Sequence, residues 1–189
     1  MPESRKNVLI LISGGIDSTA CIRFFKKLKF HVEGIFFDYG QLSLSRETRA
    51  VKKIVQFYNI PLKIVHVKGN REFSNGLISG RNAAFYFLAL MNFKNETGSI
   101  ASGIHAGTSY YDCSQTFLDQ VQGTFDGYSN GTIKVAAPFI NFSKKDIWQF
   151  CKKEKVPLHL TYSCELGKKQ PCGKCDTCID LEMLYAGTK

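Results

Sequence analysis

A run of apolar residues that ends in a glycine-rich turn constrains this chain more than any other feature. Residues 8–12 read Val-Leu-Ile-Leu-Ile, and residues 13–19 follow directly as Ser-Gly-Gly-Ile-Asp-Ser-Thr. Aliphatic and β-branched residues favour a strand, and the amphipathic pattern that begins at Ser18 favours a helix. The stretch therefore predicts a strand, a tight loop and a helix.

The glycine-rich loop predicts a phosphate site. Gly14 and Gly15 are expected to turn with positive φ, so that N–H groups of the loop and the helix start converge on oxygen anions. Ser18 is expected to cap the helix, and Asp17 to hold Mg²⁺. The loop has neither the Walker A lysine nor the dinucleotide Gly-x-Gly-x-x-Gly spacing, which favours ATP cleavage between the α- and β-phosphates. The expected ATP contacts are Ile12, Ser13, Gly14, Gly15, Ile16, Asp17, Ser18 and Thr19.

The rest of the chain alternates between strand and helix patterns. This alternation predicts an α/β fold, a doubly wound parallel sheet of about five strands with helices on both faces. Cys21, Cys151 and Trp148 fall at expected core positions, and residues 68–80 read as a loop. The expected strands after the first are 31–37, 62–67, 99–104 and 133–137; the expected helices are 18–29, 45–58, 81–93, 114–125 and one that starts at a capping box in residues 143–146.

Four of the seven cysteines have the spacing of a metal site. They are arranged as Cys-x7-Cys-x2-Cys-x2-Cys, and Gly173 allows the tight turn that brings close thiolates to one ion. Four sulfur ligands predict a closed structural zinc, with an iron–sulfur cluster or paired disulfides as alternatives. The expected division is a nucleotide-binding domain at 1–160 and a zinc-binding segment at 161–189 packed on it, with Cys164, Cys172, Cys175 and Cys178 as ligands.

Size and charge bound the class of protein. The 189 residues are 44% hydrophobic, which is enough for one domain with a full core. No targeting segment is visible, and the longest apolar run, residues 83–91, is too short to cross a bilayer, so we expect a cytoplasmic protein with no membrane partner. The net charge of +9 favours anionic partners, although paired lysines on helices are also explained as solvated faces.

Ser-Gly-Gly-x-Asp-Ser resembles the pyrophosphate loop of the ATP pyrophosphatase superfamily, whose fold is of the adenine nucleotide alpha hydrolase type. Within that superfamily, the chain from about residue 8 to 178 resembles the 7-cyano-7-deazaguanine synthases. The segments that carry this resemblance are the loop, residues 38–41, 80–82, 103–113, 138–144 and 161–164, and the three later cysteines.

The resemblance implies a homodimeric zinc enzyme that uses ATP and Mg²⁺. It would adenylate the carboxylate of 7-carboxy-7-deazaguanine, form the amide with ammonia and convert it to the nitrile. Asp38 and Lys144 also have plainer explanations as a hydrogen-bonded turn aspartate and a surface lysine, and residues 79–82 as a loop and cap. The expected catalytic residues are Asp17, Ser18, Asp38 and Lys144, and the expected substrate contacts are Tyr39, Gln41, Arg81, Asn82, His105, Asp112 and Cys113.

The chain also departs from the family pattern. Leu42-Ser43-Leu44 replaces basic residues, Thr108 and Ser109 with a shortened loop replace an aspartate, and Ser114 replaces an arginine. Lost charges would leave a less enclosed pocket, so adenylation is the safer expectation. A divergent relative would stop at the amide, or join the carboxylate to a protein amine, as relatives associated with antiphage defence are thought to do. A tRNA-modifying enzyme of the superfamily is a further alternative, although such enzymes usually add an RNA-binding domain or a reactive cysteine pair, for which 189 residues leave little room.

Overall fold

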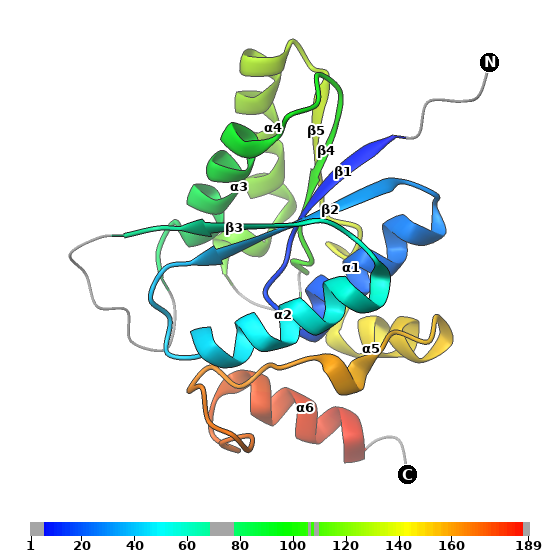
Figure 1. Ribbon diagram of the computed structural model, residues 1–189, viewed down its shortest axis with the longest axis vertical. Coiled ribbons are helices and arrows are strands. Elements are labelled where there is room, and N and C mark those ends of the chain that lie inside the picture. Colours follow the sequence, from blue (N-terminus) through cyan, green and yellow to red (C-terminus); the bar gives the residue numbers. More distant parts are fainter. Residues whose placement is uncertain (1–5, 69–77, 106, 108–109, 187–189) are drawn as a thin grey trace.

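A five-stranded parallel sheet forms the centre of the protein (Figure 1). The computed structural model describes residues 6–68, 78–105, 107 and 110–186. The strand order is β3-β2-β1-β4-β5, so the predicted doubly wound sheet is confirmed. The strands are β1 (Asn7–Leu11), β2 (His31–Asp38), β3 (Leu62–His66), β4 (Gly98–Ala101) and β5 (Ile133–Ala136).

Helices cover both faces of the sheet (Figure 1). One apolar cluster joins the sheet to α1, α2 and α5, and a second joins its other face to α3 and α4. The helices are α1 (Ile16–Lys27), α2 (Leu44–Tyr58), α3 (Arg81–Asn92), α4 (Gln115–Ser129), α5 (Lys144–Lys153) and α6 (Asp176–Ala186), with short 3₁₀ turns η1 (Tyr111–Cys113) and η2 (Leu158–Leu160).

The central strand explains why both faces must be covered. Val8 and Ile10 of β1 point into the first cluster and Leu9 points into the second, and all three side chains are buried. Successive residues of a strand face opposite sides, so an uninterrupted apolar run requires packing on both. Cys21, Trp148 and Cys151 lie in the first cluster, as the sequence predicts.

The start of α1 differs from the prediction. The helix begins at Ile16 with Gly15 as its N-cap, and Ser18 lies inside the first turn. The Ser18 hydroxyl donates to the Gly15 carbonyl at 3.2 Å, so the predicted Ser18 cap is wrong. Gly15 has φ of −80°, and only Gly14, at +83°, takes the positive φ that was expected of both. A single left-handed residue is sufficient for the turn, and Gly15 then continues as extended backbone. The capping box between Ser143 and Asp146 at the start of α5 is confirmed.

The C-terminal segment contains a helix that the sequence patterns did not predict. α6 begins within the cysteine motif and lies beside α5 (Figure 1). Leu181 and Leu184 pack against the first apolar cluster, and the ring of Tyr185 meets Trp148 edge-on at 5.0 Å between centroids. No helix in the described part of the chain has both the length and the apolar character needed to span a membrane. Residues 69–77 of the expected loop, and Thr108 and Ser109, lie outside the described residues.

The order in which successive strands join the sheet reverses between β1 and β4, although the two strands are parallel. β2 and β3 extend from one side of β1, and β4 and β5 extend from the other. In doubly wound sheets, ligands bind at the carboxyl ends of the strands at such a switch point. Gly103, just after β4, approaches α1 so closely that a Cβ there would lie 2.6 Å from the carbonyl carbon and oxygen of Asp17.

The Gly103→Ala substitution should therefore destabilise the fold. The methyl group would overlap backbone atoms of α1 that cannot rotate away, and we expect a loss of roughly 1–3 kcal/mol in the free energy of unfolding, measured with urea. Gly123→Ala is the matched control, because Gly123 lies in α4 with open space where a Cβ would stand. That control should gain roughly 0.5–1 kcal/mol. Equal stability of the two variants would contradict the close approach.

Candidate functional site

A cavity of about 310 Å³ opens at the carboxyl ends of β1, β2 and β4. It lies at the switch point of the sheet, where the strand order predicts a ligand. Its walls come from the loop after β1, the start of α1, the end of β2, the first turns of α2 and α3, and the loop after β4. The lining residues are Leu11, Ile12, Ser13, Asp17, Ser18, Phe36, Phe37, Tyr39, Gln41, Glu47, Arg81, Asn82, Phe85, Ser102, Gly103, Ile104, His105 and Cys113.

The glycine-rich loop is held by packing against α2 and by hydrogen bonds of serine hydroxyl groups. A Cβ on Gly14 would lie 3.2 Å from both Ala50 Cβ and the Glu47 carbonyl oxygen, so the loop packs directly on α2. The hydroxyl oxygens of Ser13 and Ser18 are 3.2 Å apart, and the Ser13 N–H donates to Ser18 Oγ at 3.3 Å. Hydroxyl and amide donors at a helix start suit an anionic ligand.

Asp17 occupies the centre of a charged group. Its Oδ2 accepts a hydrogen bond from Lys144 Nζ at 2.5 Å and lies 3.9 Å from His105 Nε2. Its Oδ1 is buried and, among the described residues, has no hydrogen-bond partner. A buried carboxylate oxygen without a partner is costly unless a cation or a ligand satisfies it. The donor set therefore fits a hard cation such as Mg²⁺, bound through one carboxylate and ligand oxygens.

His105 faces this group as a neutral imidazole. Burial lowers its pKa, and Lys144 lowers it further, while the Asp17 carboxylate opposes the shift. The Gly107 N–H donates to Nδ1 at 3.1 Å, so the proton of the neutral ring lies on Nε2, which faces Asp17. His105 thus presents a donor toward the carboxylate without adding a charge.

Aromatic rings form another wall of the cavity. Phe37 at the end of β2 and Phe85 in α3 stack with centroids 4.4 Å apart, and Tyr39 meets Phe85 at 5.3 Å. Burial raises the pKa of the Tyr39 hydroxyl, and the nearby Arg81 opposes the shift. A flat ring with polar edges suits such a wall, because aromatic faces stack on it while Arg81 and Asn82 supply polar groups.

The cavity gathers many of the predicted site residues. Tyr39, Gln41, Arg81, Asn82, His105 and Cys113 all line it, together with Ile12, Ser13, Asp17 and Ser18 of the loop. Four predicted residues belong to the loop and the start of α1 but do not line the cavity: Gly14, Gly15, Ile16 and Thr19. Lys144 is not a lining residue either, but it donates a hydrogen bond to Asp17, which is one.

Two further predicted residues, Asp38 and Asp112, also lie outside the cavity lining. Asp38 accepts from the Gly40 N–H at 3.2 Å and contacts His66 Nδ1 at 2.8 Å, which is the hydrogen-bonded turn of the alternative explanation. Asp112 lies on η1 and also does not line the cavity. Gln41 lines the cavity, but its side-chain amide forms hydrogen bonds with other residues of the protein. Nε2 donates to the Phe37 carbonyl and to Glu47, and Oε1 accepts from the Tyr39 N–H.

Glu47 is a residue of the cavity lining that the sequence did not predict. Its carboxylate accepts from Gln41 Nε2 at 2.9 Å and from the Ser43 hydroxyl at 2.6 Å, and the residue lines the cavity. An acidic residue in the first turn of a helix is common for electrostatic reasons alone, so its sequence position carried no specific signal. Ser102 and the aromatic pair Phe37 and Phe85 were also missed.

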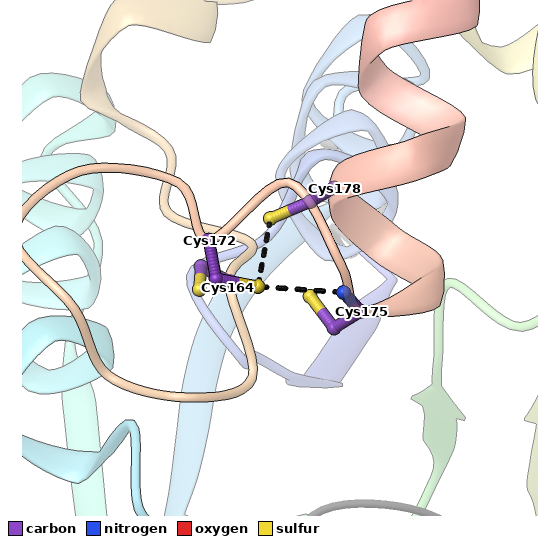
Figure 2. Close-up of side chains that lie close together, drawn as sticks. All are labelled: Cys164, Cys172, Cys175 and Cys178. Carbon is purple, nitrogen blue, oxygen red and sulfur yellow. Dashed lines mark hydrogen bonds between the residues drawn. The ribbon is translucent and has the colours of Figure 1, made fainter.

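The four predicted metal ligands come together at the other end of the chain. Their sulfur atoms all lie within 4.8 Å of one another, and Figure 2 shows Cys172 Sγ between Cys178 and the backbone nitrogen of Cys175. The N–H groups of Lys174 and Cys175 donate to Cys172 Sγ at 3.4 and 3.3 Å, and these bonds lower its pKa to about 6. Amide donors that stabilise thiolate sulfur suit a metal centre, and four close sulfurs without an open position fit a closed structural site. The cluster consists of Cys164, Cys172, Cys175 and Cys178.

Comparisons with known proteins agree with this arrangement. The family model described as "Queuosine biosynthesis protein QueC" matches residues 7–77 and 68–186. "7-cyano-7-deazaguanine synthase 2" of Desulfitobacterium hafniense (strain Y51) is 32% identical over 92% of this chain and 85% of its own length. The "7-cyano-7-deazaguanine synthase" of Oceanobacillus iheyensis is 29% identical over 92% of this chain and 90% of its own length.

Two solved structures share the fold. The U34-tRNA thiolase NcsA from Methanococcus maripaludis, described with its [4Fe-4S] cluster, aligns with a TM-score of 0.58 at 15% identity over 97% of this chain and 66% of its own. A 4-thiouridine synthetase in an RNA complex with bound ATP aligns with a TM-score of 0.56 at 19% identity over 96% of this chain and 50% of its own. At these identities, the likeness concerns the fold alone.

Loss of one cysteine should empty the metal site. We expect the purified wild type to carry about one metal ion per chain and Cys175→Ser to carry almost none, since a structural site needs all four ligands. Elemental analysis by mass spectrometry measures the content and identifies zinc or iron. Cys113→Ser is the control, because Cys113 lies outside the cluster, and it should retain the metal. Full metal content in Cys175→Ser would contradict the assignment.

Proposed function

The chain belongs to the family of the queuosine biosynthesis protein QueC and is an ATP-dependent enzyme of the carbon–nitrogen ligase type, and from this premise we propose its reaction. It adenylates the carboxylate of 7-carboxy-7-deazaguanine, releases pyrophosphate and forms an amide with ammonia. A second activation of that amide, with loss of water, would give the nitrile. The relatives' names support the product, and the cavity supports the activation step.

The observation that carries the proposal is the placement of Asp17 beside the glycine-rich loop. Its Oδ1 is buried and lacks a partner within the described residues, while Oδ2 is paired with Lys144. Mg²⁺ on this oxygen would neutralise the diphosphate that leaves, and Lys144 would stabilise the charge that develops on the α-phosphate. Both groups act on the bond between the α- and β-phosphates, which is the bond that adenylation breaks.

The proposed reaction activates the substrate twice with ATP, first as the carboxylate and then as the amide. A carboxylate oxygen attacks the α-phosphorus, the bond to the β-phosphate oxygen breaks, and pyrophosphate departs. Ammonia then attacks the carbonyl carbon of the mixed anhydride, AMP leaves, and one proton is released to form the neutral amide. In the second cycle the amide oxygen attacks the α-phosphorus of another ATP, the bond to the β-phosphate oxygen breaks, and pyrophosphate departs. AMP then leaves with the former amide oxygen, and the nitrogen loses its two protons to give the nitrile. The protein contributes mainly position and charge.

The residues of the cavity have separate proposed roles. Ser13 and Ser18 would donate to the diphosphate, and Arg81 and Asn82 would hold the carboxylate or the edge of a purine-like ring. His105 would position Asp17 through the donor on Nε2. Cys113 would contact the substrate. Asp38 and Asp112 would act only if the loops around them moved toward the cavity, since neither lines it.

We further propose zinc at the four-cysteine cluster, a homodimer and a cytoplasmic location. The leading alternative product is a conjugate between the deazapurine carboxylate and a protein amine, as in antiphage defence, because Leu42-Ser43-Leu44 and Ser114 replace basic residues of the family pattern. A tRNA acceptor is the remaining alternative, and a salt-dependent shift of tRNA in a gel would support it.

Pyrophosphate release tests the activation step. With ATP, Mg²⁺, 7-carboxy-7-deazaguanine and ammonium, the wild type should release pyrophosphate, and Asp17→Asn should lower the rate by about 100-fold or more, because the amide keeps the shape but has no negative charge to hold Mg²⁺. Asp126→Asn is the matched control, since Asp126 pairs with Lys134 on the surface of α4, and it should keep the wild-type rate. Unchanged activity in Asp17→Asn would contradict the proposed magnesium role.

Mass spectrometry of the products separates the alternatives that share this first step. Amide or nitrile would support the synthase reaction, and the ratio between them reports whether the second activation occurs. The unreacted acid with AMP and pyrophosphate would indicate that another amine is the acceptor. No substrate-dependent pyrophosphate would contradict the proposed substrate.

A further inference from the structure

The segment that leads into the cysteine cluster lies against the glycine-rich loop. The Tyr162 N–H donates to the Gly14 carbonyl at 2.9 Å, although the two residues lie at opposite ends of the chain. Beyond Gly14, a Cβ built on Gly15 would meet Ser13 Oγ at 3.5 Å, Ser163 Oγ at 3.8 Å and the Tyr162 carbonyl oxygen at 3.9 Å. The C-terminal segment thus forms one side of the turn that precedes α1.

The Ser163 hydroxyl is placed as a donor at this turn. Ser13 and Ser18 bond to each other and Ser18 also donates to the Gly15 carbonyl, so these hydroxyls must exchange partners before they donate to a diphosphate. Within the described part of the chain, by contrast, the Ser163 hydroxyl donates to no protein acceptor, and the residue is only partly buried. A diphosphate offers acceptors only, so a free hydroxyl beside a helix start can add a charge-assisted hydrogen bond.

We infer that Ser163 is a further diphosphate-binding residue, and that the four-cysteine cluster delivers it to the loop. The inference rests on the proposed function and extends it in one respect: the nucleotide site includes a group from the metal-binding segment. Metal occupancy and nucleotide affinity are therefore coupled through Ser163.

The packing around the cluster explains the coupling. Ser163 directly precedes Cys164, which is buried and is one of the four ligands. The loop between Cys164 and Cys172 packs on the turn after β2, where a Cβ on Gly167 would lie 2.3 Å from the Leu42 carbonyl oxygen. The Tyr162 hydroxyl donates to the Lys168 carbonyl at 2.8 Å and ties this loop back to the segment. With no metal, the cysteine segment loses its cross-links and Ser163 loses its fixed position.

Binding coupling of this kind is reciprocal. If the metal raises the affinity for the nucleotide, the nucleotide must raise the affinity for the metal by the same factor. The gain in nucleotide affinity must also be specific for the diphosphate part of the ligand. Ser163 stands beside Gly15 of the loop and is not part of the aromatic wall formed by Phe37 and Phe85.

The first test compares Ser163→Ala with the wild type in calorimetric titrations with α,β-methylene-ATP and Mg²⁺. We expect the Kd to rise about 10-fold, the loss of one hydrogen bond to a charged group. The Kd for AMP, which lacks the diphosphate, should not change. Ser45→Ala is the matched control, because Ser45 is exposed on α2, and it should change neither affinity.

The second test measures the coupling directly. Metal is removed with a chelator, and the Kd for α,β-methylene-ATP is compared before and after removal in the wild type and in Ser163→Ala. We expect metal removal to weaken binding in the wild type and to have a smaller effect in Ser163→Ala, because the hydroxyl that transmits it is absent. Hydrogen exchange of residues 12–19 should rise after metal removal.

The outcomes separate this inference from the proposed function. If the wild type binds the analogue and Ser163→Ala binds it equally well, Ser163 is not a ligand and the inference fails while the adenylation proposal stands. Equal losses for AMP and the analogue would also overturn it, because they would indicate a general distortion of the cavity. If the wild type binds no analogue at all, the proposed function fails as well.

Discussion

The left-handed turn at Gly14 is the constraint on which the candidate site depends. At φ of +83° the chain leaves β1 and enters α1 within a few residues. A side chain there would be strained by the positive φ and crowded by Ala50 Cβ and the Glu47 carbonyl oxygen, which lie 3.2 Å from the Cβ position. The Gly14 carbonyl accepts from the Tyr162 N–H, so the C-terminal segment holds the same residue from the other side. α2, α1 and the cysteine segment thus meet at a single glycine, and together they fix the direction of the amide and hydroxyl donors.

Around this turn the protein places opposite charges from distant parts of the chain. Asp17 comes from the first turn of α1 and Lys144 from the first turn of α5, and their ion pair leaves one carboxylate oxygen buried without a protein partner in the described residues. The cost of such an atom in the ligand-free protein is recovered only when a cation or ligand binds. The switch point of the sheet supplies the space, and the aromatic wall of Phe37 and Phe85 supplies a surface for a flat ring.

Local patterns predicted the sheet, its helices and the metal ligands, because each of these depends on neighbouring residues. Apolar runs identify buried strands, and a four-cysteine spacing identifies one metal centre. Contacts between residues far apart in the sequence were not predictable in this way, as for the pairing of Asp17 with Lys144 and of Tyr162 with Gly14. The sequence did not predict α6, because the helix begins within the cysteine motif and its apolar pattern is not distinct there. The Ser18 cap was wrong because a serine near a helix start can as readily donate back to the preceding turn.

We expect the glycine-rich loop to bind the diphosphate of ATP. A crystal structure with α,β-methylene-ATP and Mg²⁺ tests this most directly. The β- and γ-phosphates should accept hydrogen bonds from the backbone N–H groups of residues 13–18, with the metal ion on Asp17 Oδ1 and Lys144 turned toward the α-phosphate. Phosphates bound away from this loop, or Asp17 still without a ligand on Oδ1, would contradict it.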